Sequence, residues 1–147
     1  MSTDENKAVV RRFVDEIFDQ GNVAAVDELV ADSFVPHTWP SVTGKEDFKQ
    51  TVVRMAKAVK DPHHTIDDMV AEGDKVSVRL TSHAVQTGDV MGVKAAGKEY
   101  TIAEQHIFRI VNGKVVEHWH VADMLGMMQQ IGAFPERPKA SKASKAS

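Results

Sequence analysis

Cysteine is absent from this 147-residue chain, which excludes disulfide scaffolds, thiol catalysis and cysteine-based metal sites. No apolar run approaches the ~18 residues of a membrane-spanning helix, and the first residues lack the basic-then-apolar pattern of a signal peptide. We therefore predict a cytoplasmic protein without a membrane partner. A chain of this length supports one domain, with one core and at most one enclosed pocket.

Positive charge is scarce in most of the chain. Of the 18 basic and 21 acidic residues, four basic and one acidic lie after Phe134, so residues 1–134 hold 14 basic and 20 acidic side chains, a balance of −6. An acidic body argues against nucleic acid as a partner. Residues 135–147 contain a threefold KAS repeat with little to bury, and we predict that they form a disordered basic tail after a single domain over residues 1–134.

Hydrophobic periodicity separates predicted helices from predicted strands. Before Pro62, apolar residues recur at helical spacing in three stretches. The first stretch stops at Gly21, and the second begins with Asn22 as its cap. The third begins at a capping box of Thr43 and Glu46. After Pro62 apolar and polar residues alternate, so the order predicts an α+β fold with three N-terminal helices packed on one face of a curved, mainly antiparallel sheet.

Asn112 and Gly113 form the strongest hairpin signal, because both positions of a tight hairpin turn require positive φ. A two-residue turn there pairs residues whose numbers sum to 225, so that His106 opposes Trp119. The side chains then predicted to face the core or a pocket are Ile102, Glu104, His106, Phe108, Ile110, Val115, Glu117, Trp119, Val121 and Asp123, whereas His118 and His120 are predicted to face away.

The predicted inner face carries ionisable groups among hydrophobic neighbours: Glu104, His106, Glu117 and Asp123. Burying such groups is costly unless they are paired or surround a cavity, and polar groups that converge in an apolar hollow are typical of a ligand site. Desolvation raises the pKa of a carboxyl toward the range useful for proton transfer. Asp123 and Glu104 are therefore the candidate acid/base groups.

These residues also have structural interpretations. Asp123 directly precedes a helical stretch and is a favoured N-cap residue. His106 can be a hydrogen-bonded core histidine, and Glu117, close to the hairpin tip, can reach solvent. The predicted register puts His106 and Asp123 four residues apart along paired strands, or ~13 Å, so no direct hydrogen-bonded dyad is expected.

Two further groups have residue types that occur in binding sites. His118 and His120 share a strand face, but no carboxylate follows at the spacing of a cupin-type metal site, so we predict no metal ion. We expect instead that they lie in a subunit interface of a homodimer or higher homo-oligomer. His37 and Trp39, in a loop between helices, are expected at the mouth of a pocket, with plugging of the helix bundle as the alternative.

Three segments carry a resemblance to a known family: RRFVDEIFDQGNVAAVDELVADSFVPH, TGDVMGVKAAGK and EQHIFRIVNGKVVEHWHVADMLGMMQQIG. Over about residues 4–134 the chain resembles the SnoaL-like polyketide cyclases, within the nuclear transport factor 2-like fold, and its most specific part is FRIVNGKVVEHW followed by Asp123. The resemblance implies a cone-shaped roll of helices around a strongly bent sheet. It also implies intramolecular aldol-type ring closure of a small hydrophobic carbonyl compound, without a cofactor, with Asp123 as acid and base.

His106 is the second catalytic candidate in this interpretation. The expected substrate contacts are Trp119, Glu104, His37, Trp39 and Phe108.

The same fold hosts isomerases, dehydratases, epoxide hydrolases and pure binding proteins, so other functions stay open. A ketosteroid-isomerase-like site needs a tyrosine beside the acid, and Tyr100 is predicted on the far side of Ile102 from His106. An epoxide-hydrolase-like site needs an arginine on the inner face, but Arg79 and Arg109 are predicted to face outward. The non-enzymatic alternative is a carrier, sensor or dimerisation domain for a hydrophobic ligand.

Overall fold

The computed structural model describes residues 1–135, so the predicted tail lies outside the described residues apart from Pro135. Helices come first and long strands follow, as the periodicity predicts. The elements are α1 (Thr3–Arg12), the π-helical segment η1 (Phe13–Asp19), α2 (Val23–Leu29), β1 (Val30–Pro36), α3 (Lys45–Ala58), β2 (Val59–Glu72), β3 (Lys75–Gln86), β4 (Glu99–Val111), β5 (Lys114–Ala122) and α4 (Met124–Gln130).

The first helical stretch ends, and the second begins, at the predicted positions. The Ser2 side chain caps α1 by accepting a hydrogen bond from the Glu5 N–H, and α1 continues without a break into η1. Gly21, with a φ of 63°, ends this run. The Asn22 side chain then caps α2 by accepting from the Ala24 N–H.

The third helix differs from its prediction at both ends. Its N-cap is Gly44, and the Thr43 N–H donates to Asp47 rather than to Glu46. The helix gives way to β2 at Val59, so Pro62 lies inside a strand instead of after a helix. Because β2 is an edge strand of the sheet, a residue without an N–H is tolerated there.

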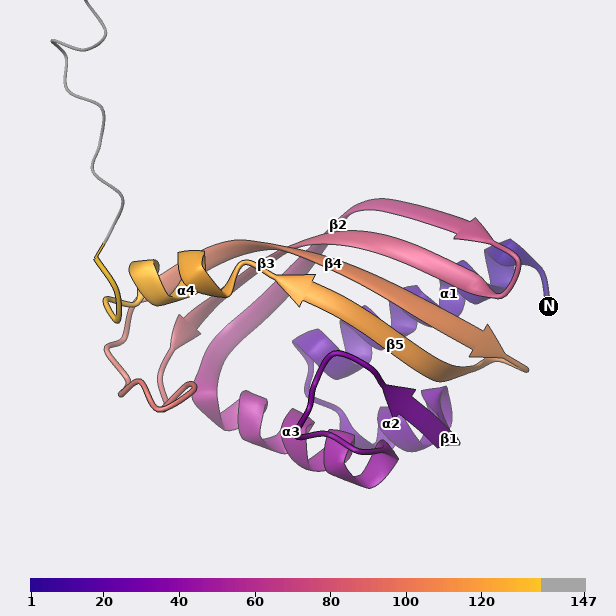
Figure 1. Cartoon of the computed structure of the whole chain (residues 1–147), viewed down its shortest axis with the longest axis horizontal. Coiled ribbons are helices and arrows are strands. Elements are labelled where there is room, and N and C mark those ends of the chain that lie inside the picture. Colours follow the sequence, from indigo (N-terminus) through magenta and orange to yellow (C-terminus); the bar gives the residue numbers. More distant parts are fainter. Residues whose placement is uncertain (136–147) are drawn as a thin grey trace, which may run out of the picture.

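Five strands form one sheet in the order β1-β5-β4-β3-β2. β1 pairs in parallel with β5, and the other neighbours are antiparallel. The long strands bend, and α1, α2 and α3 lie on one side of the sheet, while α4 follows the end of β5 (Figure 1). The α+β prediction is confirmed, with β1 as an additional strand in a region that the periodicity assigned to a helix and a loop.

A β-bulge in the β4–β5 hairpin makes the predicted register wrong beyond its first pairs. Asn112 and Gly113 have the positive φ values expected of the turn, and Ile110 pairs with Val115 as predicted. Val116 is then an extra residue on β5, so that the next pair is Arg109 with Glu117 and the pairs that follow are also shifted.

A shift of one residue moves every following side chain to the opposite face of the strand. His118 and His120, predicted to face away, therefore lie on the core side, where His120 pairs with His106. Glu117, Trp119 and Val121, predicted to face the core, lie on the outer side, and Val121 is 69% exposed.

The main core lies between the helices and the sheet. Its largest fully buried side chains include Phe13, Phe48, Phe108 and Leu80. A second buried cluster, around Tyr100 and the methionines of α4, closes the other end of the domain. No helix among residues 1–135 is long and apolar enough to cross a membrane.

Candidate active site

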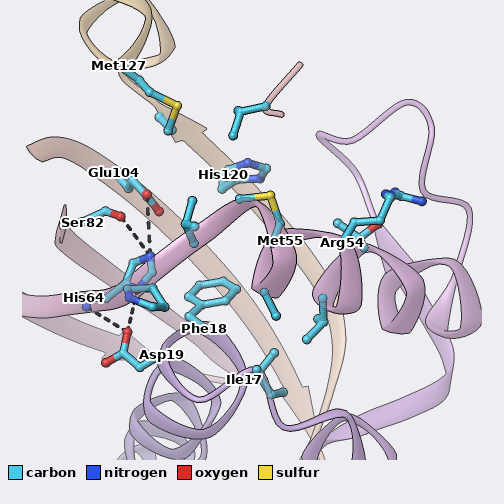
Figure 2. Close-up of a pocket in the computed structure, with 18 of the residues that line it drawn as sticks. Ile17, Phe18, Asp19, Arg54, Met55, His64, Ser82, Glu104, His120 and Met127 are labelled. Atoms are coloured by element: carbon cyan, nitrogen blue, oxygen red, sulfur yellow. Dashed lines mark hydrogen bonds and ion pairs between the residues drawn. The ribbon is translucent and has the colours of Figure 1, made fainter. Parts of the chain in front are cut away.

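A cavity of about 500 Å³ lies between the helices and the inner face of the sheet. This volume is typical of small-molecule sites. Residues of η1, α3, α4 and the strands β2 to β5 line it, and Figure 2 shows several of them pointing into the same space. Its apolar walls include Ile17, Phe18, Val52, Met55, Ile102 and Met127. A few polar side chains converge between these walls.

A carboxylate and an imidazole form the first polar pair. His64 Nδ1 lies 2.7 Å from Asp19 Oδ1, and the same oxygen accepts the His64 backbone N–H at 2.9 Å (Figure 2). With Nδ1–H donating to the carboxylate, Nε2 carries the lone pair of the neutral ring. This nitrogen is 3.2 Å from Ser82 Oγ and 3.8 Å from Glu104 Oε2. The second nitrogen of His64 is therefore an acceptor close to a second carboxylate.

A chain of hydrogen bonds continues from Glu104 into the core. Glu104 Oε1 accepts from His106 Nε2 at 2.7 Å, and His106 Nδ1 is 2.8 Å from His118 Nε2. His118 Nδ1 is buried and has no hydrogen-bond partner among the described residues. If the Nε2–H of His118 donates to His106 Nδ1, the atom left unpaired is His118 Nδ1, as a bare lone pair.

Opposing effects act on the charges of this chain. Burial raises the pKa of Glu104, but the hydrogen bond and charge of His106, together with His64 and Ser82, outweigh burial and lower the pKa overall. Glu104 is therefore ionised near neutral pH. Burial, followed by the nearby charges of His106 and His120, lowers the pKa of His118 well below its usual value, so this ring is neutral.

His120 brings a further imidazole to the cavity. Its Nδ1 lies 2.7 Å from Thr38 Oγ1, and this oxygen also accepts the His120 backbone N–H at 2.9 Å. When Thr38 donates its own proton to Nδ1, Nε2 of His120 carries the ring hydrogen. Burial, and then the charge of His106, lowers the pKa of His120 to about 4. The ring is thus a neutral hydrogen-bond donor near pH 7.

Three of the residues predicted from the sequence line the cavity: Trp39, Glu104 and His106. Phe108, a predicted substrate contact, is fully buried in the core and stacks beside His106 and His118. Among the described residues, the cavity lining includes none of His37, Phe108, Trp119 and Asp123.

His37 and Trp119 contact one another instead, on the outer side of the sheet. Their rings stack with centroids 4.7 Å apart, and His37 Nε2 is 3.0 Å from Glu117 Oε1. The predicted inward orientation of Trp119 is wrong because the bulge reverses it. The pocket-mouth position predicted for His37 is wrong because the ring joins this outer group.

Asp123 is exposed and forms the N-cap of α4, where its Oδ1 accepts the Gly126 N–H at 2.9 Å. The structural interpretation of this residue as a helix cap therefore describes its position, and its predicted place on the inner face of the hairpin is wrong. The hairpin ladder ends at the pair of Glu104 with Ala122, so Asp123 does not pair with Ile102.

Sequence reasoning missed the cavity residues Asp19, His64, Ser82 and His120, and it placed Tyr100 away from the acid. Asp19 and His64 are 45 residues apart, and no local pattern connects them. Alternation along β3 could have indicated Ser82, which lies between buried residues of that strand. Tyr100 is 4% exposed, and burial, then the charge of Glu104, raises its pKa to about 12, which keeps its hydroxyl protonated.

Three imidazoles could also hold a metal ion. One ligand atom from each of His106, His118 and His120 lies within 4.8 Å of the other two.

The sequence profile of the SnoaL-like polyketide cyclases matches residues 8–131. The chain is 28% identical over 130 residues to the aklanonic acid methyl ester cyclase DauD of Streptomyces sp. strain C5, with 84% of this chain and 80% of DauD covered. It is also 28% identical to DnrD, the aklanonic acid methyl ester cyclase of Streptomyces peucetius, with 84% of this chain and 88% of DnrD covered.

Solved structures share the fold of this chain. TsrD from Streptomyces laurentii superposes with a TM-score of 0.84 at 28% identity and covers 91% of this chain and 99% of its own. AclR from Streptomyces galilaeus, proposed to be a hydroxylase, has a TM-score of 0.85 at 26% identity. The match covers 99% of this chain and 92% of AclR.

Proposed function

Because the chain belongs to the SnoaL-like polyketide cyclase family, we propose that it closes a ring in a small, hydrophobic, polyketide-like carbonyl compound by an aldol-type reaction without a cofactor. The relatives DauD and DnrD, both aklanonic acid methyl ester cyclases, support this substrate class. One observation carries the proposal: His64, whose Nε2 lies beside the Ser82 hydroxyl, stands between two carboxylates in an apolar cavity.

His64 is the proposed general base. Its Nε2 removes a proton from a methylene group flanked by carbonyls, and the C–H electron pair moves to a carbonyl oxygen as an enolate. The positive charge that forms on the ring lies 2.7 Å from Asp19 and 3.8 Å from Glu104, as measured between the nearest nitrogen and oxygen atoms. Two carboxylates at these distances stabilise an imidazolium, so they favour the proton transfer.

Hydrogen-bond donors then stabilise the enolate oxygen. His120, whose Nδ1 is engaged by Thr38, presents an N–H to the cavity, and Tyr100 contributes a protonated hydroxyl. Donors held in place in a site of low polarity stabilise a developing negative charge better than water does.

Ring closure follows within the same molecule. The enolate carbon attacks a ketone carbon, a C–C bond forms, and the resulting alkoxide takes back the proton from His64. The product has the same composition as the substrate, so no oxidant, reductant or leaving group is needed. The apolar walls keep water from the enolate and hold the flexible substrate in a folded conformation.

The proposal is tested with a synthetic polyketide ester that carries an activated methylene and a ketone, with ring closure followed by mass spectrometry and chromatography. His64→Gln should lower kcat by about 10²- to 10⁴-fold, the usual contribution of a general base. Asp123→Asn should keep its activity, because asparagine caps helices as well as aspartate does.

Loss of activity in Asp123→Asn with full activity in His64→Gln would transfer the role of base to Asp123. Binding of the ester without turnover by the wild-type chain would support the carrier or sensor alternative. The melting temperature of each variant must match that of the wild type for these comparisons to hold.

We also propose that the outer face of the sheet pairs with a second copy of the chain. Val70, Ser77, Ile107 and Trp119 form one row of neighbouring positions across β2, β3, β4 and β5 on this face. Val70 and Ile107 are exposed, as is Val121 further along β5. An exposed apolar area that continues over several strands favours an interface.

A further inference from the structure

We infer that His106, His118 and His120 form a binding site for one divalent transition-metal ion. We call these three residues the histidine cluster. The inference does not rest on the proposed ring closure, whose base and first carboxylate, His64 and Asp19, lie outside the cluster. The two proposals share His120, which would be a ligand in the metal site and is a hydrogen-bond donor in the ring closure, so each has its own test.

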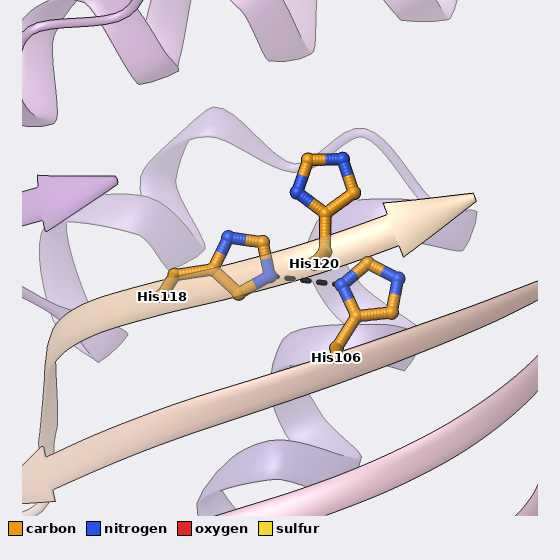
Figure 3. A group of neighbouring side chains, drawn as sticks. All are labelled: His106, His118 and His120. Atoms are coloured by element: carbon orange, nitrogen blue, oxygen red, sulfur yellow. Dashed lines mark hydrogen bonds between the residues drawn. The ribbon is translucent and has the colours of Figure 1, made fainter. Parts of the chain in front are cut away.

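The bulge at Val116 creates the cluster. It turns His118 and His120, two residues apart on β5, toward the core side, and it sets His120 directly opposite His106 on β4. Figure 3 shows the three rings side by side above these two strands. Because neighbouring strands in one sheet hold them, the rings are positioned by rigid elements rather than by a loop.

The ring geometry is close to that of a metal site. The ring centroids are 5.1 to 5.2 Å apart, and the planes of any two rings differ by 14° or less. Zinc–nitrogen bonds of about 2.0–2.1 Å place tetrahedral ligand atoms about 3.3 Å apart. His106 Nδ1 and His118 Nε2, now 2.8 Å apart, must therefore separate by a few tenths of an ångström to bind one ion. The distances from the His120 ligand atom to these two atoms, now up to 4.8 Å, must shorten.

The second nitrogen of His106 is already held as it is in metal sites. A histidine ligand usually donates its other ring N–H to a carboxylate, which fixes the ring and strengthens the ligand. His106 Nε2 makes this contact with Glu104 Oε1 at 2.7 Å, so Nδ1 is the atom available to an ion.

Burial of the cluster is costly without a ligand. His106 and His118 are 2% and 1% exposed, and within residues 1–135 their facing nitrogens, His106 Nδ1 and His118 Nε2, have only one another as partners. Burying neighbouring imidazoles in a core gives no stability that apolar residues would not provide.

The donor atoms indicate which ions bind. Three imidazole nitrogens without a thiolate suit Zn²⁺, Co²⁺, Ni²⁺ or Cu²⁺. Three protein ligands leave a fourth position open, as in catalytic zinc sites. His106 and His120 line the cavity, so a small oxygen ligand would reach the ion from that side.

The experiment uses the tag-free, full-length chain after treatment with a chelator. Calorimetric titration with Zn²⁺ should give one ion per chain, and Co²⁺ should give the visible absorption of a four-coordinate nitrogen site. His120→Gln should abolish specific binding. Glu104→Gln should weaken it by about 10- to 100-fold, the usual effect of losing the carboxylate behind a ligand.

His83→Gln is the matched control, because His83 lies outside the cluster and bonds only to Thr101 in the described structure. The control should bind like the wild type. Absence of stoichiometric binding by the wild-type chain overturns the proposal, and so does stoichiometric binding that survives in His120→Gln. Glu104→Gln checks the inference independently if the ligand variant fails to fold. Binding is measured without substrate, so failure of the cyclase assay leaves this result unaffected.

Discussion

His64 owes its proposed role to the different partners of its two ring nitrogens. Asp19 holds Nδ1 and so fixes the tautomer, while Nε2 faces the cavity and the second carboxylate. Asp19 is the carboxylate that holds Nδ1. Glu104 lies near Nε2 instead and is itself hydrogen-bonded to His106. The pair Asp19 and His64 therefore acts as one unit, in which the acid positions the base.

This positioning role predicts the effect of Asp19→Asn. The amide keeps the shape of the side chain but can present an N–H to Nδ1, which favours the wrong tautomer, so kcat should fall by about 10²- to 10⁴-fold with little change in KM. Steady-state kinetics on the polyketide ester measure both constants. A variant with unchanged kcat would show that Asp19 only supports the fold.

The neutral imidazoles predict how stability depends on pH in the presence of a chelator. The pKa values of His118 and His120 are lowered in the folded chain, so the unfolded chain binds protons first when the pH falls below about 6.5. Stability should be complete near pH 7.5 and decrease as the pH falls from about 6.5 toward the folded pKa of His120, about 4. Urea unfolding at several pH values measures this dependence.

His120→Gln is the comparison for this titration. Glutamine has no charge to gain, so the variant should lose less stability on acidification than the wild type. An equally steep dependence in both proteins would assign the effect to other groups.

At the scale of elements, α4 depends on the side chain that precedes it. Asp123 caps the helix, and Gly126, the residue whose N–H it holds, leaves room for the carboxylate because a Cβ there would collide with it. The helix closes one end of the cavity through Met127.

Asp123→Ala should lower the free energy of unfolding by about 0.5–2 kcal/mol, whereas Asp123→Asn should change it by only a few tenths of a kcal/mol, about the difference between good capping residues. Thermal and urea unfolding give both values. Equal losses in the two variants would mean that the carboxylate charge matters more than the cap.

The bulge is the other element-scale feature with consequences for function. With the unbroken register, Trp119 and Glu117 would face the core, and the imidazoles of His118 and His120 would face away from it. One extra residue, Val116, exchanges these two sets. The cavity wall and the histidine cluster both depend on it.

At the scale of the whole molecule, the two faces of the sheet have different roles. The inner face forms the core and the cavity, and the outer face presents apolar side chains beside ion pairs such as Arg109 with Glu117. A second copy that covers this outer face would leave the cavity unobstructed, because the cavity lies on the other side of the sheet.

Val121→Glu should therefore convert a dimer into a monomer, since a charge in an apolar interface is costly to bury. Light scattering coupled to size-exclusion chromatography measures the mass in solution. Leu125→Glu, at an exposed apolar position on α4, is the matched control and should stay dimeric. A wild-type chain that is monomeric at all concentrations would contradict the proposed interface.

Local sequence signals determined much of the secondary structure of this protein. Gly21 and Asn22 mark the boundary between the first helices, because a positive φ ends one and a side-chain cap begins the next. Asn112 and Gly113 determine the hairpin turn for the same kind of reason. Alternating apolar residues, such as those of β3, determine a strand with one buried face. These signals act over a few residues, so the sequence by itself predicts most of the elements, their order and the α+β class, but not β1.

The tertiary structure decided which side chains meet. The bulge at Val116 has no signal in the residue pattern, and it reversed the orientation of every later residue on β5. Asp19 and His64 come together only because η1 packs against β2, across 45 residues of chain. Periodicity reports which face of an element is buried, but the contacts between elements depend on register and packing. For this reason the sequence indicated Glu104, whereas the proposed base His64 and its partner Asp19 could be identified only from the folded chain.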